Sequence, residues 1–220
     1  MIKNTLCSWS GGKDSCFALM QAINLGYLPK VLLNVLNEEG NISRSHGIPS
    51  TILEAQAAAA GLPIHLISSS WQDYEIKFTG ALSTLKKEYD LHYTVFGDID
   101  LQAHRDWEEK VCQNAGLAAV LPLWKQDRKK LVIQMLEAGI DTMIVSCNDT
   151  MGEKFIGRRI DLPLIDELES LGIDPCGENG EYHTLVLDCP LFSSGLNAVV
   201  TNTIKHDRYW FGQLDLRDNS

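Results

Sequence analysis

A strand, a glycine turn and a helix follow one another at the start of the chain, and this order restricts its fold more than any other feature. Residues 4–9 have the pattern of a β-strand, and from Phe17 onward apolar residues recur at the spacing of an amphipathic helix that stops at Gly26. Between the two segments lie Ser10, Gly11, Gly12, Lys13, Asp14 and Ser15. Free backbone N–H groups and the helix dipole favour an anion at such a turn, so we expect it to bind phosphate.

The residues of this turn also indicate which phosphate chemistry it serves. Its two glycines let a phosphate approach the backbone, Lys13 supplies a cation, and Asp14 is a candidate ligand for Mg²⁺. A Walker A loop is excluded, because Asp14 stands where that motif has Ser or Thr after its lysine. The six residues resemble instead the pyrophosphate-binding loop of the N-type ATP pyrophosphatases, which split ATP into AMP and pyrophosphate. This resemblance implies ATP and Mg²⁺ as cofactors.

Composition narrows the partners that we expect for the chain. Its formal net charge is −10, which argues against a protein that holds nucleic acid through bulk electrostatics. No apolar run approaches the ~18 residues of a membrane span. The N-terminus has no signal-peptide core, so we expect a cytoplasmic protein without a membrane partner. The six cysteines form no C-x-x-C pair, which argues against a zinc site or a disulfide framework.

Strands and helices alternate through the first half, which indicates an α/β fold with a parallel sheet flanked by helices. Expected strands are residues 4–9, 31–36, 64–67, 94–97, 118–121, 142–147, 184–187 and 198–204. Expected helices are residues 15–25, 51–60, 73–89, 103–115, 128–138 and 162–171. Residues 122–124 have the composition of a hinge, so we expect a first domain at residues 1–124 and a smaller α/β domain at residues 125–220.

A second dense cluster of polar and small residues lies at 174–184. Its glycines and its asparagine permit positive φ, so we expect a shaped turn, and such turns commonly carry binding groups. A solvated hairpin loop is the alternative interpretation. The residues expected to contact a substrate here are Gly177, Glu178, Asn179, Gly180, Glu181, Tyr182 and His183.

Gly97 and Asp98 follow an expected strand, at the edge where open α/β sheets bind their ligands. Asp98 either contacts magnesium or a ligand hydroxyl, or it serves only as the N-cap of the next helix. The polar residues at 104–108 are predicted to form a surface helix with internal ion pairs.

Three more polar residues are candidates for ligand contacts. Asn34 and His46 lie in and after the second strand, and we expect them to contact the nucleoside. A polar loop without a binding role is the alternative for His46. Arg158 is either a contact to phosphate or to a substrate carboxylate, or a solvated cation.

Together these segments resemble one family, the diphthine–ammonia ligase (diphthamide synthase) family of ATP pyrophosphatases. The shared motifs run from the first glycine turn to the Gly-Glu-x-Gly-Glu-Tyr loop at 177–182 and cover nearly the whole chain. The resemblance implies a HUP-type nucleotide-binding fold and an amidation, in which a carboxylate attacks the α-phosphate of ATP and ammonia then displaces AMP. It also implies diphthine on elongation factor 2 as the acceptor, and it suggests a homodimer. The catalytic residues expected on this basis are Lys13, Asp14, Glu178, Glu181 and His183, and the expected magnesium ligands are Asp14 and Asp98.

The second loop departs from the diphthamide-forming pattern at two residues. Asn179 replaces a glycine and His183 replaces a glutamate, which changes the charge and the hydrogen bonding of the expected acceptor loop. This loop is more similar to a branch of the family that has been linked to vitamin B12 salvage in bacteria, so a corrinoid-related carboxylate stays open as the acceptor. Two other functions stay open as well. One is a tRNA-thiolating enzyme, for which Cys147 and Cys176 are the candidate cysteines, and the other is a nucleotide sensor without enzymatic activity.

Overall fold

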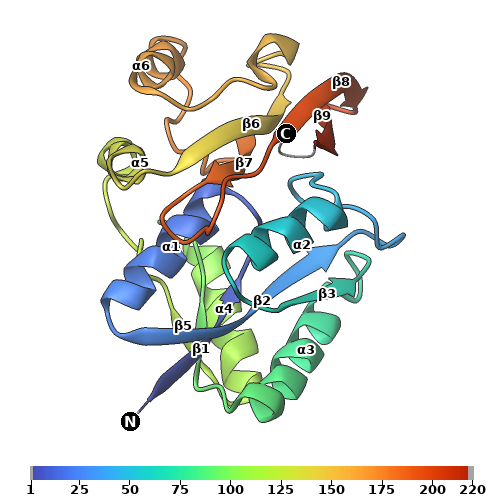
Figure 1. Ribbon diagram of the computed structural model, residues 1–220, viewed down its shortest axis with the longest axis vertical. Coiled ribbons are helices and arrows are strands. Elements are labelled where there is room, and N and C mark those ends of the chain that lie inside the picture. Colours follow the sequence, from blue (N-terminus) through green and yellow to red (C-terminus); the bar gives the residue numbers. More distant parts are fainter. Residues whose placement is uncertain (1, 218–220) are drawn as a thin grey trace.

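The computed structural model describes residues 2–217, which form two β-sheets with helices around and between them (Figure 1). The first sheet has five parallel strands in the order β3-β2-β1-β4-β5. Its strands are β1 (Lys3–Ser8), β2 (Tyr27–Leu36), β3 (Ile64–Ser68), β4 (Tyr93–Val95) and β5 (Ala118–Val120). The helices between them in the chain are α1 (Lys13–Asn24), α2 (Ser50–Ala59), α3 (Tyr74–Tyr89) and α4 (Gln102–Ala115). The expected α/β fold with a parallel sheet is confirmed.

Alternating side chains on the central strands explain why helices cover both faces of this sheet. Leu6 on β1 and Leu33 on β2 belong to a core that includes Phe78 of α3 and other apolar residues of α3 and α4. Their neighbours Cys7 and Leu32 belong to a second core, which includes the apolar residues of α1 and α2. Successive strand residues point to opposite faces, so strands buried along their whole length need helices on both sides.

The second sheet is antiparallel and has the order β7-β6-β9-β8. Its strands are β6 (Asp141–Asn148), β7 (Tyr182–Asp188), β8 (Ala198–His206) and β9 (Tyr209–Leu216), and α5 (Arg128–Glu137), η1 (Glu153–Phe155) and α6 (Leu162–Ser170) accompany them. These elements, drawn in yellow to red in Figure 1, lie on the side of α1 and α2. Their apolar residues continue the core of α1 and α2. The domain boundary expected at residue 125 separates the two sheets along the chain and stays a prediction.

Three details differ from the expectations, each for a local reason. β2 begins at Tyr27 rather than at residue 31, and the register between β1 and β2 shifts opposite Pro29, which has no N–H to donate. β9 was not expected, although its aromatic residues pair with β6 and β8. Tyr182 and His183, expected in a turn, already belong to β7 and pair with β6. No helix within residues 2–217 combines the length and the apolarity that crossing a membrane requires.

Candidate active site

A cavity of about 900 Å³ lies where the strand order of the first sheet reverses, beyond the carboxyl ends of β1 and β4. Open α/β sheets bind their ligands at such a reversal point, and the volume is in the range of small-molecule sites. The predicted site residues that line this cavity are Ser10, Asp14, Ser15, His46, Gly97, Asp98, Gly177, Glu178, Asn179, Gly180, Tyr182 and His183. The fold therefore brings the first glycine turn and the second loop to one cavity.

The turn at residues 10–15, which we name the phosphate side of the cavity, accepts only glycine at two positions. Gly11 has a φ of +84°, and a Cβ there would lie 2.9 Å from Gln56 Oε1. A Cβ on Gly12 would lie 2.6 Å from His46 Cε1. Gly12 is also the N-cap residue of α1. Because glycine has no side chain, the cap residue accepts no side-chain hydrogen bond from the backbone N–H groups in the first turn of the helix. Such a helix start suits a phosphate.

Gly97 keeps β4 close to the start of α1. A Cβ on Gly97 would lie 2.8 Å from both the carbonyl carbon of Asp14 and the backbone nitrogen of Ser15. Gly97 was expected to allow a close approach of the backbone, and the segment that comes close to it is the first turn of α1.

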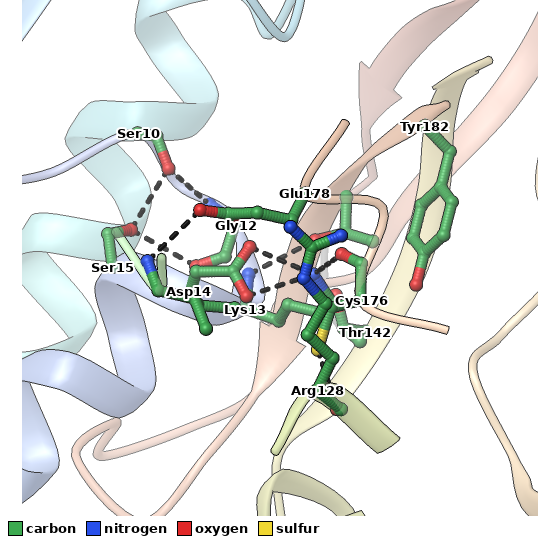
Figure 2. Close-up of polar contacts among 12 residues, drawn as sticks. Ser10, Gly12, Lys13, Asp14, Ser15, Arg128, Thr142, Cys176, Glu178 and Tyr182 are labelled. Atoms are coloured by element: carbon green, nitrogen blue, oxygen red, sulfur yellow. Dashed lines mark hydrogen bonds and ion pairs between the residues drawn. The ribbon is translucent and has the colours of Figure 1, made fainter. Parts of the chain in front are cut away.

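Lys13 is almost fully buried, with 2% of its surface exposed. Its Nζ donates to the two carboxylate oxygens of Asp14, at 2.9 and 2.8 Å, and to the carbonyl oxygen of Cys176 (Figure 2). Burial by itself lowers the pKa of Lys13, but Asp14, Tyr182 and Cys176 together outweigh burial, so the net pKa is raised. A charged ammonium group is thus held next to the phosphate side.

Gln56 of α2, which the sequence did not single out, connects the turn to the second sheet. Its side chain is fully buried, and its Nε2 donates to the carbonyl oxygens of Gly11 (3.0 Å) and Val186 (2.7 Å). Its Oε1 accepts a hydrogen bond from Trp9 Nε1 at 3.0 Å. Val186 of β7 in turn donates from its N–H to the carbonyl of Gly11. One side chain therefore fixes the turn relative to both halves of the chain.

His46 and His183 form a pair of uncharged rings on the cavity wall. Their ring centroids are 4.5 Å apart, and His46 Nδ1 donates to the carbonyl oxygen of Thr184 at 3.0 Å. Burial lowers the pKa of His46 to about 4. Burial, together with His46 and Lys13, lowers the pKa of His183 well below its usual value. Both imidazoles are therefore neutral at pH 7 and act as hydrogen-bonding groups rather than as cations.

Glu178 reaches from the second loop to the loop after β4. Its Oε1 accepts a hydrogen bond from the N–H of Ile99 at 3.0 Å. Burial raises the pKa of Glu178 to about 7; the Ile99 N–H lowers it, while the carboxylates of Asp14 and Asp98 raise it further. A carboxyl group with this pKa can accept or release a proton near neutral pH.

Arg128 at the start of α5 anchors this loop, although the sequence analysis did not assign it a role. Its guanidinium group pairs with Asp100, at 2.9 and 2.6 Å, and with Asp174. The Asp174 carboxylate also accepts hydrogen bonds from the N–H groups of Cys176 and Glu178, both at 3.0 Å. These contacts join the loop that carries Glu178 to α5 and to the loop after β4.

Asp98 lines the cavity as expected, but α4 gives it two partners. His104 Nδ1 lies 2.7 Å from Asp98 Oδ1, and Glu108, which is 3% exposed, interacts with the same carboxylate. Burial raises the pKa of Asp98, but its contacts with His104 and Glu108 outweigh burial, and the net pKa is lowered. Burial and then Asp98 raise the pKa of Glu108 to about 11, so Asp98 is ionised while Glu108 is protonated. The N-cap alternative for Asp98 is wrong, because α4 is capped by Leu101.

The expectation that residues 104–108 form a surface helix is correct only for one side of α4. Arg105 and Glu109 form the expected exposed ion pair at 2.7 Å. His104, Trp107 and Glu108 line the cavity instead. Their i, i+3, i+4 spacing places them on one face of a helix, and this signal was available in the sequence. Trp71, Tyr74 and Phe96 complete an aromatic wall that the sequence analysis did not identify.

Six predicted residues lie off the cavity lining: Gly11, Gly12 and Lys13 of the first turn, and three more. Asn34 is buried in the first sheet, where its Nδ2 donates to the backbone carbonyl of Trp9 at 2.7 Å. Arg158 forms an ion pair with Glu167 at 2.8 Å. Glu181 accepts hydrogen bonds from the backbone N–H and the side-chain Nδ2 of Asn179. The ligand contacts of Asn34, Arg158 and Glu181 stay predictions.

Magnesium remains an expectation of the sequence. Residues 2–217 contain no group of three or more His, Cys, Asp or Glu side chains arranged to hold a metal ion. The two expected ligands, Asp14 and Asp98, both line the cavity. A magnesium ion bound chiefly by nucleotide phosphates needs only one or two protein carboxylates, so this pair is compatible with it.

Comparisons with known proteins identify two family models in this chain. The model described as the diphthamide synthase N-terminal domain matches residues 3–119, and the diphthamide synthase C-terminal domain matches residues 127–218. A diphthine–ammonia ligase from Schizosaccharomyces pombe is 29% identical over 90% of this chain and 36% of its own length. Those from Danio rerio and Homo sapiens are 28% and 27% identical over 90% of this chain and 87% and 83% of theirs. The chain thus spans about a third of the first relative and most of the other two.

Among solved structures, a predicted subunit of tRNA methyltransferase from Methanocaldococcus jannaschii aligns with 85% of this chain and 98% of its own. The TM-score is 0.45 and the sequence identity is 17%. A likeness of this size supports no argument about function.

Proposed function

The chain belongs to the diphthamide synthase family, and from this premise we propose that it is an AMP-forming carbon–nitrogen ligase that amidates a carboxylate with ATP and ammonia. The acceptor that we propose is diphthine, because the curated relatives are named diphthine–ammonia ligases. The observation that supports this chemistry best is the meeting of the glycine turn and Glu178 at one cavity. An adenylating ligase needs a phosphate site next to a group that handles protons, and the cavity offers both.

In the first step a carboxylate oxygen of the acceptor attacks the α-phosphorus of ATP. A bond from that oxygen to phosphorus forms, the bond between the α-phosphorus and the bridging oxygen breaks, and pyrophosphate leaves. Lys13 and the backbone N–H groups at the start of α1 stabilise the charge that develops on pyrophosphate. The Ser10 and Ser15 hydroxyls, 3.0 Å apart at the cavity wall, assist them.

In the second step ammonia attacks the acyl carbon of the acyl-adenylate. The carbon–nitrogen bond forms, the bond to the AMP oxygen breaks, and the surplus proton on nitrogen passes to Glu178, whose pKa of about 7 suits a proton acceptor. His46 and His183 stay neutral and orient the reactants through hydrogen bonds. Mg²⁺ held by Asp14 and Asp98 against the phosphates would offset their negative charge.

The other functions left open by the sequence have less support. A tRNA-thiolating enzyme needs a reactive cysteine, yet Cys147 and Cys176 are buried and burial raises the pKa of each thiol to about 12. The names of the relatives do not favour a corrinoid-related acceptor or a sensor. We further expect a cytoplasmic homodimer without nucleic-acid or membrane partners, in keeping with the net charge of −10.

The test is an assay of the purified protein with ATP, Mg²⁺, ammonium and elongation factor 2 that carries diphthine. We expect AMP and pyrophosphate in equal amounts, together with a mass change on the factor that corresponds to replacement of a hydroxyl by an amino group. ADP and phosphate as products would refute the proposed chemistry. AMP formation with a corrinoid carboxylate, and none with diphthine, would refute the proposed acceptor alone.

A further inference from the structure

The guanidinium group of Arg128 contacts the loops on both sides of the Glu178 carboxyl group. Its Nε and one terminal nitrogen donate to the two carboxylate oxygens of Asp100, at 2.9 and 2.6 Å, and its other terminal nitrogen donates to Asp174. Asp100 follows Ile99 in the loop after β4, and Asp174 begins the loop that carries Glu178. One planar group therefore joins two loops that are far apart in the chain.

Each of these loops supplies one end of the hydrogen bond between Ile99 and Glu178. Asp174 Oδ2 accepts the backbone N–H of Glu178 at 3.0 Å, and Glu178 Oε1 accepts the N–H of Ile99 at 3.0 Å. The N–H of Lys125, shortly before Arg128 in the chain, donates to the carbonyl of Ile99 at 2.7 Å. Arg128 thus fixes both ends of a hydrogen bond that it does not make.

The contact between Arg128 and its two carboxylates has one preferred geometry. A guanidinium group is a rigid fork that binds a carboxylate through two parallel N–H bonds, as it does with Asp100, whereas an ammonium group is a point charge without this fork. The side chain of Asp174 is only 7% exposed, so water competes little for its oxygens. Such a contact can transmit a position from one loop to the other.

We propose that Arg128 is a positioning residue for the second step of the reaction, because it keeps the Glu178 carboxylate beside the Ile99 N–H where that carboxylate accepts the proton of the attacking nitrogen. Glu178 lines the cavity and Arg128 does not, so Arg128 acts through Glu178. Ile99 occupies one carboxyl oxygen of Glu178, which leaves the other for the proton. The part in the reaction rests on the proposed function, while the control of the Ile99–Glu178 contact does not.

The groups that set the charge of Glu178 are separate from the partners of Arg128. The charged and titratable groups that act on Glu178 or respond to it are Lys13 and Asp14 on α1, Asp98 after β4, His104 and Glu108 on α4, and Cys176 on its own loop. Within residues 2–217 the guanidinium group of Arg128 pairs instead with Asp100 and Asp174. A substitution of Arg128 therefore changes where Glu178 lies and leaves all of these groups in the protein.

The amide proton of Ile99 tests the geometric part by NMR without any turnover. In the unaltered protein its chemical shift should follow the titration of Glu178, with a midpoint near pH 7, because an N–H bond to a carboxylate is stronger than one to a neutral acid. In Arg128→Met the Ile99 amide should lose this midpoint and exchange with solvent at least about tenfold faster. Glu178→Gln should also lose the midpoint, which assigns it to Glu178.

Two further variants separate position from charge. Arg128→Lys keeps the positive charge without the fork, so the Ile99 exchange rate should lie between those of the unaltered protein and Arg128→Met. Arg159→Met removes a guanidinium group that forms an exposed pair with Asp141, and as the matched control it should keep the midpoint and the exchange rate. Thermal unfolding shows whether each variant is folded.

The acceptor assay tests the part in the reaction. When Glu178 is displaced, ammonia attack slows, and water attacks the acyl carbon instead, which breaks the bond to the AMP oxygen and restores the carboxylate. Arg128→Met should therefore form about half an amide or less per AMP, where the unaltered protein forms equal amounts. The KM for ATP should change less than about twofold, because the phosphate side is untouched. The inflection of amide formation near pH 7 should be lost.

An Ile99 midpoint and exchange rate that Arg128→Met leaves unchanged would overturn the inference, and so would the lack of a midpoint in the unaltered protein. If Arg128→Met does not fold, Arg128→Lys is judged by the same measurements. Loss of the midpoint in a protein that never forms AMP would refute the proposed ligase and keep the control of Glu178 by Arg128. Equal amounts of amide and AMP in Arg128→Met would keep the ligase and refute the part of Arg128 in the second step.

Discussion

The phosphate side of the cavity and the wall formed by Tyr74, Asp98, Trp107 and Glu108, which we name the aromatic side, are built in opposite ways. The phosphate side consists of six consecutive residues, 10–15, which run from the turn after β1 into the first turn of α1. A side chain larger than that of glycine would collide with neighbouring atoms at positions 11 and 12. The aromatic side combines α3, α4 and the loop after β4, whose residues come together only in the folded sheet. The difference shows that one wall of a site can be set by a local motif while the facing wall depends on tertiary packing.

The two sides also differ in how firmly their charges are held. On the phosphate side Lys13 is 2% exposed and pairs with Asp14, so its charge has a fixed position. On the aromatic side the side chain of His104 is 58% exposed beside Asp98. Electrostatic stabilisation of a transition state needs fixed charges, whereas recognition of different acceptors tolerates adaptable ones. We expect changes on the phosphate side to affect the chemistry and changes on the aromatic side to affect the choice of acceptor.

The largest effect is expected for Lys13→Ala. Loss of the ammonium group removes charge stabilisation from the leaving pyrophosphate, so AMP formation should fall by on the order of 10³-fold. The measurement is the rate of AMP and pyrophosphate release at saturating ATP. Lys87→Ala, on the exposed side of α3, is the control and should leave the rate unchanged. An unchanged rate in Lys13→Ala would show that the phosphate side is not where ATP reacts.

Glu178→Gln should come next, with a loss of on the order of 10²-fold in amide formation. Glutamine can still accept the hydrogen bond from the Ile99 N–H, but it cannot take a proton from the attacking nitrogen. Amide product is measured by mass spectrometry across pH 6–9, and the variant should lose the inflection that the unaltered enzyme shows near pH 7. Glu137→Gln, an exposed residue of α5, serves as the control. A retained inflection would exclude Glu178 as the proton acceptor.

Gln56→Ala tests how the phosphate side is attached to the second sheet. The substitution leaves the buried indole N–H of Trp9 and the carbonyls of Gly11 and Val186 without this partner, so the free energy of unfolding should fall by about 2–3 kcal/mol. Chemical denaturation measures it, with the exposed Gln113→Ala as the control. A loss below about 0.5 kcal/mol would mean that the turn keeps its place without Gln56.

The smallest effect concerns the pH dependence of stability at the His46–His183 wall. The folded protein has a pKa of about 4 at His46 against 6.5 for the free group, so between these values the unfolded chain binds more protons. Stability is therefore fully present above pH 6.5 and falls as the pH approaches 4. Lys13 and His183 are the charged and titratable groups that act on His46.

His46→Asn should reduce this acid-induced loss by about 1–2 kcal/mol between pH 6.5 and 4. Denaturation curves at several pH values measure the difference, and the exposed His206→Asn should behave like the unaltered protein. An identical pH dependence in His46→Asn would show that His46 does not stay neutral in the folded protein.

Most elements of the fold were predictable, because hydrophobic period and turn residues are local signals. The expected helices match α1 to α6, and the parallel sheet follows from the alternation of strands and helices. β9 was missed because its aromatic residues alternate only weakly with polar ones, and pairing with β6 and β8 stabilises it. In the site, Trp107 and Glu108 were expected on a solvated helix. Their spacing shows that they share one helix face, but the sequence does not show that α4 turns this face to the cavity.

The sequence alone determined the glycine turn before α1 and the Gly-Glu-Asn-Gly-Glu-Tyr loop, because backbone conformation and helix starts depend on neighbouring residues. Only the tertiary structure decided which groups face these segments. Gln56, Arg128, His46 and Glu108 acquire their roles from contacts with distant parts of the chain. The protonation of Glu108 and the neutrality of the two histidines follow from burial and from neighbouring charges, which exist only once the two sheets have packed together.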